Sequence, residues 1–319
     1  YFLGGSANWA NIRGVFQSNI KELKIYEEGS FEEENRADVW GIDDFDLFKE
    51  ADKRLKKLHE KDKPFVAYIQ TATNHMPYTV PDKKESFMPI LKKNIDEETL
   101  LKGGFRSLWQ LNGIRYLDFN VARFLERAKE SGYYENSIFV FFGDHSIILK
   151  GLNGLNNKEV NLGIQLNHTP CFIHAPKYVK PQIVDKYAKL IDVFPTATSL
   201  AKIDYINYTL GRDLLDSTTT NTAAFIYTQN KGEGAVGLIK DGFYYEKTNK
   251  SKKAGLYSLN TNTYQDIKAS KLDVSEKMDS LLSAYYYTTK YLYFNNKKQP
   301  KPNVKYKWEK QKKLIKKYY

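Results

Sequence analysis

Apolar strand-like runs alternate with helical patterns along the chain up to about residue 216. The strand-like runs cover residues 1–5, 64–73, 138–145 and 169–177. Helical spacing of apolar residues covers 7–20, 43–62, 97–130 and 184–203, with an interruption expected at Gly103 and Gly104 and a break at Pro195. Strands that alternate with helices indicate crossover connections between parallel strands. The pattern therefore predicts an α/β fold with a mostly parallel, doubly wound sheet flanked by helices.

The pattern changes near Thr220. Short apolar runs separated by Gly, Asn and Asp follow, which is typical of an antiparallel meander. A helix is then expected over 275–294. We therefore predict an α/β domain over 1–216, a small α+β subdomain over 217–296 and a basic tail over 297–319.

The composition indicates a folded protein and limits the classes of molecule that it is expected to bind. Of the 319 residues, 41% are hydrophobic, which is enough for a large core. The net charge of +11 comes with lysines spread over the whole chain, and no basic-helix or aromatic-platform motif occurs, so we predict no nucleic-acid partner. The tail interleaves Lys with Tyr and Trp. A solvated tail is the simpler interpretation, and contact with an anionic membrane surface is the alternative.

The single cysteine, Cys171, excludes an intramolecular disulfide, and we expect it to be buried because it lies in an apolar run. No apolar run reaches the length of about eighteen residues that a membrane-spanning helix needs. The chain begins Tyr-Phe-Leu-Gly-Gly, without Met and inside a strand-like run. We therefore expect it to be part of a longer protein, whose targeting or membrane segments could lie upstream.

Polar residues that a core does not need stand at the edges of three strand-like runs. Asn74 and His75 follow the second run in "TATNHMPY", and Asp144 and His145 end the third in "FFGDHS". His168 stands just before the fourth run in "LNHTPCFIHAP". Ligand sites in such folds form beyond the carboxyl ends of the strands. These residues are therefore the candidates for a functional site.

Asp144 and His145 have the chemistry of metal ligands. The tight turn at Gly143 allows both side chains to converge on one point, and a carboxylate with a neutral imidazole suits an ion such as Mn²⁺ or Zn²⁺. Two ligands are too few for a tight site, so others must come from elsewhere. The alternative is that the pair only caps the strand in solvent. Of the remaining histidines, His59 is expected to be solvated and His174 to be a hydrogen-bonded core residue.

The stretch "GYYENSIFVFFGDHS", preceded by "IRYLDFNVARFLERAKES", resembles the sulfatase and alkaline-phosphatase superfamily. It is most similar to the branch of lipoteichoic acid synthases and phosphoglycerol transferases. Further segments resemble that family in the family's order, namely "YFLGGSANWANIRGVF", "DVWGIDDFDLF", "YIQTATNHMPYTVP", "NHTPCFIHAP" and "IDVFPTATSLAKI" with "GRDLL". The resemblance extends from Phe2 to Leu215 and implies an alkaline-phosphatase-like fold.

The resemblance implies roles for the metal and catalytic candidates. Asp144 and His145 would be ligands of a catalytic divalent metal, with Mn²⁺ expected first and Zn²⁺, Ca²⁺ or Mg²⁺ as alternatives. His75 would face the substrate phosphate or its leaving group, and His168 would approach the same site. The family's nucleophile and another acidic ligand lie upstream of the matched segments. We therefore expect this chain to hold about half of the metal shell and no nucleophile.

The resemblance also implies a substrate pocket. Trp40 and Asp38 would line it for a group like glycerol phosphate, and Asn74 lies beside His75 at the same strand end. Each has a structural alternative. Trp40 could be ordinary core packing, and Asn74 could merely cap a turn.

The family mechanism implies the function. In it, a hydroxyl activated by the metal attacks phosphorus or sulfur and forms a covalent enzyme ester, which water or an alcohol then resolves. Our first hypothesis is a metal-dependent transferase of a phosphoglycerol or similar phosphoryl group linked to a membrane lipid. The full-length protein would be anchored in the cell membrane, with this domain on the periplasmic or extracellular side. The alternatives are a sulfatase or phosphodiesterase acting as a hydrolase on an anionic ester, and a non-catalytic pseudoenzyme or binding module.

Overall fold

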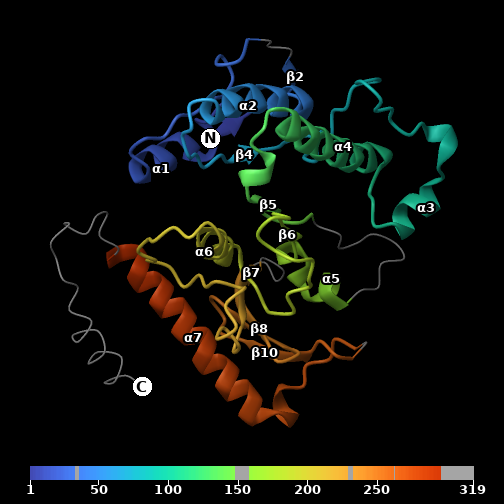
Figure 1. Ribbon diagram of the computed structural model, residues 1–319. Coiled ribbons are helices and arrows are strands. Elements are labelled where there is room, and N and C mark those ends of the chain that lie inside the picture. The colour runs from blue at the N-terminus through green and yellow to red at the C-terminus, as the bar shows by residue number, and fades with distance from the viewer. Residues whose placement is uncertain (33–35, 148–157, 229–232, 262, 296–319) are drawn as a thin grey trace.

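The computed structural model describes residues 1–32, 36–147, 158–228, 233–261 and 263–295 (Figure 1). The first part of the chain forms β1 (Phe2–Leu3), α1 (Ile12–Asn19), β2 (Arg36–Asp38), β3 (Gly41–Ile42), α2 (Asp44–His59), β4 (Ile69–Gln70), α3 (Glu97–Lys102) and α4 (Leu108–Glu130). The next part forms β5 (Phe139–Phe142), α5 (Lys158–Leu162), the short 3₁₀ helix η4 (Ile164–Asn167), β6 (Cys171–His174) and α6 (Leu190–Leu200). The last part forms β7 (Ala224–Thr228), β8 (Ala235–Lys240), β9 (Phe243–Thr248), β10 (Ala254–Ser258) and α7 (Leu272–Asn295).

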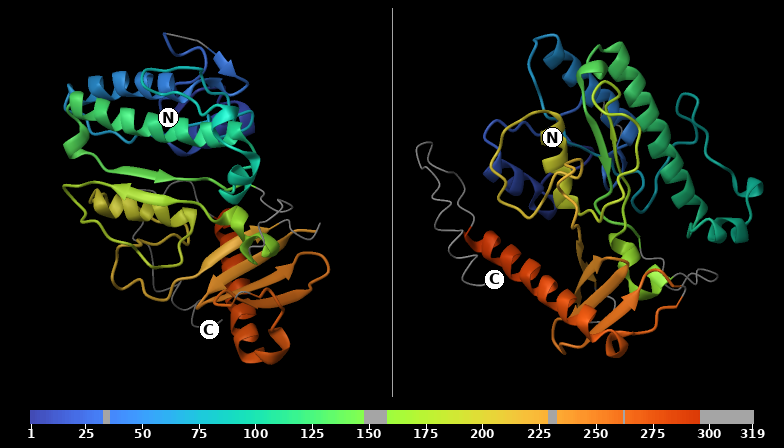
Figure 2. Two further views of the ribbon diagram at one scale, coloured as in Figure 1. Left: turned by 90° about the vertical axis from the view of Figure 1, so that its right-hand side faces the viewer. Right: turned by 60° about the horizontal axis from the view of Figure 1, so that its bottom comes forward.

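Helices α2 and α4 lie side by side at one end of the molecule (Figure 2). Helix α2 begins after Asp43, whose carboxylate accepts hydrogen bonds from the backbone N–H groups of Phe45 and Asp46. Acidic residues occupy its first turn and basic residues its last, which suits the helix dipole. Helix α4 begins after Ser107, which caps Gln110. The interruption expected between residues 97 and 130 is confirmed, since α3 ends at Lys102 and α4 begins at Leu108.

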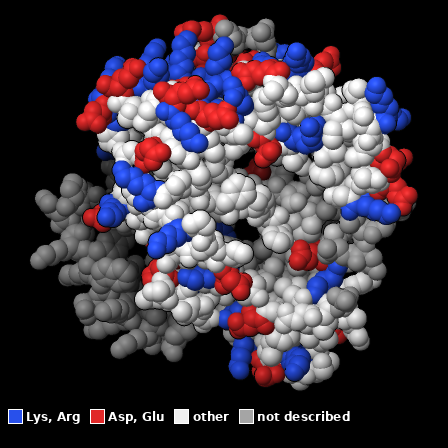
Figure 3. All heavy atoms as spheres, turned by 45° about the vertical axis from the view of Figure 1, so that its right-hand side comes forward, with Lys and Arg blue, Asp and Glu red and all other residues white. Residues whose placement is uncertain are grey.

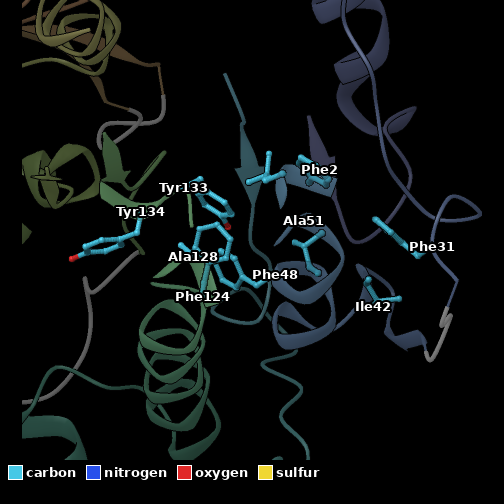
Figure 4. Close-up of a cluster of buried hydrophobic side chains, with 11 residues drawn as sticks. Phe2, Phe31, Ile42, Phe48, Ala51, Phe124, Ala128, Tyr133 and Tyr134 are labelled. Carbon is cyan, nitrogen blue, oxygen red and sulfur yellow. The ribbon is translucent and has the colours of Figure 1, made fainter. Parts of the chain in front are cut away.

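A core of buried side chains fills the space between α2, α4 and the strands (Figure 4). Helix α2 contributes Phe48 and Ala51, and α4 contributes Phe124 and Ala128. The ring of Phe48 packs on that of Phe124 with 4.8 Å between centroids. Full burial of a large apolar side chain contributes about 1.5–3 kcal/mol. The segments that carry the candidate site are therefore held against a well-packed layer.

The strand pairing is less parallel than the sequence predicts. Strands β1 and β4 pair in parallel, with Leu3 opposite Gln70, whereas β5 and β6 pair antiparallel, with Phe142 opposite Cys171. Strand β6 begins beside the end of β5, which makes the pair antiparallel. A parallel pair would require the chain to cross back to the other end of β5 first. Cys171 is exposed, so the expectation that it is buried is wrong. It stands opposite Phe142, which is also exposed, in the last residue pair of the β5–β6 register.

Helix α6 runs unbroken through Pro195, where the sequence predicts a break. Proline removes one helical N–H and normally leaves the carbonyl four residues earlier without its partner. That carbonyl belongs to Ile191, and a Cβ built on Gly211 would lie only 2.0 Å from its oxygen. The backbone at Gly211 therefore packs closely over the turn that the proline weakens.

The predicted antiparallel meander is confirmed as the four-stranded sheet β7–β8–β9–β10, and the predicted helix over 275–294 is confirmed as α7. Leu238 and Leu256 of the sheet pack with Met278 and Leu282 of α7. The domain boundaries at 216 and 296 remain predictions. The basic tail over 297–319 lies outside the described residues.

Lys and Arg are mixed with Asp and Glu over the face shown in Figure 3, and they form no single basic stripe there. In the part of the chain that the structure describes, no helix is both long enough and apolar enough to cross a membrane.

Candidate active site

Two consecutive turns follow β4 and carry the first candidates. The backbone N–H of His75 donates to the carbonyl of Ala72 at 2.9 Å, and that of Tyr78 donates to the carbonyl of His75 at 2.7 Å. Asn74 and His75 are exposed, while Thr73 is buried. The turns therefore present the side chains of Asn74 and His75 to solvent beyond the end of β4.

Trp40 lies against His75, as expected if both line one pocket. It belongs to the β2–β3 hairpin, and its ring centroid is 4.5 Å from that of His75. The carboxylate of Asp38 accepts the backbone N–H of Trp40 at 2.7 Å, so Asp38 shapes the turn that carries the indole. Gly41 has φ of +100°, and a Cβ there would lie 1.9 Å from the oxygen of Gly4. The hairpin thus packs directly on the chain that follows β1.

Trp9 is a further aromatic residue at this place that the sequence analysis missed. Its ring centroid is 5.3 Å from that of Trp40, and 63% of the residue is exposed. Trp9, Trp40 and His75 are called the Trp–His cluster below. An exposed indole beside a polar candidate is an unusual use of a large apolar side chain and indicates a contact surface. The sequence signal that could have identified Trp9 is its position in "YFLGGSANWANIRGVF", one of the segments that resemble the family.

The backbone of Met76 orients both rings of the pair. Its carbonyl oxygen accepts a hydrogen bond from Nε1 of Trp40 at 2.8 Å, and Nδ1 of His75 lies 2.8 Å from the same oxygen. A carbonyl only accepts, so Nδ1 of His75 must carry the proton. In the neutral imidazole, Nε2 then has the lone pair. Nε2 is therefore the atom that could take a proton, or donate one when the ring is charged.

Asp144 and His145 stand at the end of β5 on a segment that is held on both sides. The N–H of Gly143 donates to the carbonyl of Pro170 at 3.1 Å, and the N–H of Ser146 donates to the carbonyl of Leu166 at 2.9 Å. The side chains of Asp144 and His145 are 75% and 64% exposed. They are available to a ligand on a backbone that the neighbouring segment keeps in place.

The imidazole of His145 is oriented as a metal ligand needs to be. Its Nδ1 lies 2.9 Å from the carbonyl oxygen of Ser146, so Nδ1 carries the proton and the lone pair is on Nε2. The carboxylate of Asp144 accepts the N–H of His145 at 2.9 Å and is 3.8 Å from Nε2. A carboxylate beside a neutral imidazole nitrogen fits a divalent cation.

His168 lies on the segment that pairs with Asp144 and His145. The β5–β6 register sets Phe142 opposite Cys171, and one step beyond it Gly143 bonds Pro170. Further on, Ser146 bonds Leu166, so the segment that holds His168 runs beside Asp144 and His145. The imidazole Nδ1 of His168 lies 3.3 Å from a carboxylate oxygen of Glu159, and its side chain is 76% exposed. His168 is therefore near the pair, although Glu159 engages one of its ring nitrogens.

The two groups of candidates lie on segments that touch through a ring contact. Tyr68, which directly precedes β4, contacts Phe142 at the end of β5 with 6.1 Å between ring centroids. Burial raises the pKa of the Tyr68 hydroxyl, and the nearby charge of Asp144 adds to the effect. Asp144 therefore lies close to the strand that leads to the turn of His75.

The described residues do not contain a complete metal shell. Among them, no group of three or more His, Cys, Asp and Glu side chains could hold a metal ion. Asp144 and His145 fit the chemistry of two such ligands, and the expectation that the remaining ligands come from elsewhere stays a prediction. His174, in contrast, is engaged in the core, where its Nε2 is hydrogen-bonded to the hydroxyl of Tyr134, as expected for a core histidine.

Comparison with known proteins gives the same family as the motifs. The family model described as Sulfatase matches residues 3–203. The lipoteichoic acid synthase of Staphylococcus saprophyticus is 33% identical over 200 residues, which are 60% of this chain and 29% of that protein. Lipoteichoic acid synthase 1 of Bacillus subtilis is 31% identical over 194 residues, which are 58% of this chain and 28% of that protein. The chain thus spans less than a third of the length of these relatives.

Solved structures share the fold. A protein of the alkaline phosphatase superfamily from Vibrio parahaemolyticus superposes with a TM-score of 0.69 and 24% identity, covering 92% of this chain and 64% of that one. A lipoteichoic acid synthase from Listeria monocytogenes superposes with a TM-score of 0.66 and 18% identity, covering 90% of this chain and 68% of that one. The predicted α/β, alkaline-phosphatase-like fold class is therefore confirmed.

Proposed function

Because this chain belongs to the sulfatase family of enzymes, we propose that it carries part of the catalytic domain of a metal-dependent enzyme that acts on phosphate esters. The reaction we favour is transfer of a phosphoglycerol or similar phosphoryl group from a membrane lipid. The named relatives support this choice, since both are lipoteichoic acid synthases. The observation that supports the proposal is the exposed carboxylate of Asp144 beside the oriented imidazole of His145, on a segment bonded to the one that holds His168.

In this proposal Asp144 and His145 hold a divalent cation, with Mn²⁺ favoured over Zn²⁺, Ca²⁺ or Mg²⁺. When bound, the cation supplies charge neutralisation for the anionic ester and lowers the pKa of an attacking hydroxyl. Residues of this chain would then transfer a proton and stabilise the anionic group. Nε2 of His75 faces the ester and moves a proton to or from the leaving oxygen. His168 stabilises the same anionic group from the neighbouring segment.

The Trp–His cluster would recognise the group that is transferred. The exposed ring of Trp9 and the half-buried ring of Trp40 form an apolar wall beside His75. Such a wall would pack against the carbon backbone of a glycerol-like group while the imidazole contacts its phosphate. Asn74 would add a polar contact from the same turn, and Asp38 would act by shaping the hairpin of Trp40.

We further propose that the full-length protein works at the cell membrane, with this domain on the periplasmic or extracellular side. A lipid-linked donor would require this location. Exposed rings at the end of α7 would provide a second contact with a lipid surface. Tyr287, Tyr291 and Phe294 are spaced to lie on one face of the helix and are each more than 60% exposed. Aromatic rings of this kind favour the headgroup region.

The test of the metal assignment is calorimetry of Mn²⁺ binding to the full-length protein. Asp144→Ala should lower the affinity at least about tenfold, because one ligand of the shell is lost. Asp118→Ala, on the exposed side of α4, is the matched control and should leave the affinity unchanged. Equal affinities of wild type and Asp144→Ala would refute the assignment. Turnover of a phosphodiester substrate but not of a chromogenic sulfate would support the reaction class, and the reverse would refute it.

A further inference from the structure

The side chain of Asp44 is buried at the start of α2 and is not used by its own helix. Only 1% of the residue is exposed. The preceding residue, Asp43, already caps α2 by accepting from Phe45 and Asp46. The basic side chain in this region, Lys84, pairs with Asp43 at 3.4 Å and with Asp46 at 3.0 Å. Capping and ion pairing at this helix end are thus provided by its neighbours.

Asp44 instead binds the backbone of the turn that leads to His75. One carboxylate oxygen accepts the N–H of Ala72 at 2.8 Å, and the other accepts the N–H of Thr73 at 3.1 Å. These N–H groups belong to the chain between β4 and His75, and the His75 N–H in turn bonds the carbonyl of Ala72. A single carboxylate therefore sets the course of the backbone just before His75.

Helix α4 closes on the same turn from another direction. A Cβ built on Gly113 would lie 2.8 Å from the carbonyl oxygen of Thr73 and 3.4 Å from the ring of Tyr78. The turn is therefore confined between a helix that touches its carbonyl side and a carboxylate that binds its N–H groups. Movement of the turn would break either a close packing contact or a buried hydrogen bond.

A carboxylate is the side chain that this geometry requires. The two backbone N–H groups here donate to different acceptor atoms, and a carboxylate provides both on one short side chain. Asparagine would provide one acceptor and would place an N–H₂ group against the second donor. A buried charge costs free energy unless it is hydrogen-bonded. A chain that keeps such a charge gains a rigid turn from it.

We propose that Asp44 is a positioning residue for His75: by binding the N–H groups of Ala72 and Thr73 it fixes the turn that sets the imidazole against Trp40. The inference rests on the proposed role of His75 for its effect on turnover, but the positioning itself is independent of that role. A shift of about 1 Å in a catalytic group can reduce turnover up to about 100-fold. The effect of removing the acceptor should therefore appear in kcat more than in KM.

The experiment uses the full-length protein labelled with ¹³C-histidine, with the His75 ring signals assigned by His75→Gln. Asp44→Asn should move or broaden those signals and lower kcat about 10- to 100-fold with KM within about threefold. The matched control is Asp46→Asn, a buried acid of the same helix that bonds Lys84 and not the turn. It should leave the His75 signals at their wild-type positions.

Unmoved His75 signals in folded Asp44→Asn would overturn the positioning role, whatever the activity. Moved signals with normal kcat would keep the positioning role and refute the proposed catalytic role of His75. Hydrogen exchange in the wild type adds a measurement that needs no variant. The amides of Ala72 and Thr73 should be protected, because their acceptor is buried, and exchange at the rate of unstructured amides would also overturn the proposal.

Discussion

Burial of Asp44 has a measurable consequence for stability, which Asp44→Asn isolates. Loss of solvent raises the pKa of this carboxyl group from its ordinary value of 3.8 to about 6, against the opposing effect of the hydrogen bonds from Ala72 and Thr73. The negative charge of the adjacent Asp43 adds to the rise. The folded state therefore holds this proton more tightly than the unfolded state does.

The sign and size of the effect follow from that difference. Because the folded-state pKa is raised, the stability that the protonated group contributes is complete below the unfolded-state value of 3.8 and is lost as the pH rises through about 6. The full loss is about 3 kcal/mol in the free energy of unfolding. Between about pH 4.5 and about pH 8, roughly 2 kcal/mol of it should be observed.

The assay is urea unfolding of wild type and Asp44→Asn across this pH range. The substitution removes the titrating group and leaves one N–H without an acceptor, which costs about 1–3 kcal/mol relative to the wild type with Asp44 protonated. Wild type should thus be clearly more stable than Asp44→Asn at low pH, and the difference should shrink by roughly 2 kcal/mol as the pH rises. Near pH 8 the two proteins should be close in stability.

Asp46→Asn is a graded control for the same measurement. Burial and the charge of Asp43 raise the pKa of Asp46 as well, while its pair with Lys84 opposes the rise. Its difference from wild type should change with pH in the same direction but less. The difference in free energy of unfolding between wild type and Asp44→Asn must change from about pH 4.5 to about pH 8, because a buried carboxyl group with a raised pKa titrates differently in the folded and unfolded states. A constant difference over this range would refute the reasoning.

Three further predictions concern the hairpin, the C-terminal core and the metal. Gly41→Ala should lower the free energy of unfolding by about 3 kcal/mol, since its new Cβ would lie 1.9 Å from the oxygen of Gly4 at φ of +100°; urea unfolding with a near-normal value would contradict the fold of this hairpin. Leu282→Ala should cost about 3 kcal/mol, because the side chain is 2% exposed beneath the sheet, and a loss below about 1 kcal/mol would show that α7 does not pack there. Dialysis of the full-length protein against EDTA should abolish phosphodiester turnover and Mn²⁺ should restore it, whereas turnover that survives complete chelation would argue against metal dependence.

Much of the element order could be predicted from the sequence, because the patterns behind it are local. The acids of 43–46 followed by lysines near 56 indicate the start and end of α2, and Gly103 with Gly104 indicates the gap between α3 and α4. The prediction of a helix break at Pro195 was wrong because its outcome depends on a contact that is not local. Whether a proline ends a helix depends on what covers the freed carbonyl of Ile191, and here the cover is Gly211, far along the chain.

The candidate site was predicted in part. The residue types at strand ends pointed to Asp144, His145 and His75, and the geometry brings Trp40 to His75. The sequence did not indicate that Trp9 stands beside Trp40, because their contact joins a short 3₁₀ helix and a hairpin about thirty residues apart. It also did not separate Asp44 from the acids around it.

The sequence by itself determined most of the helices, the meander, the family and the residue types that could hold a metal, since each of these depends on neighbours within a few turns of chain or on motifs in a fixed order. Tertiary structure alone decided which nitrogen of His75 carries the proton, which segment confines Asp144 and His145, and which of three neighbouring acids binds the turn before His75. These outcomes depend on distances between segments that are distant in the chain. Burial then gives one carboxylate, Asp44, a pKa and a role that the same residue type on the surface would not have.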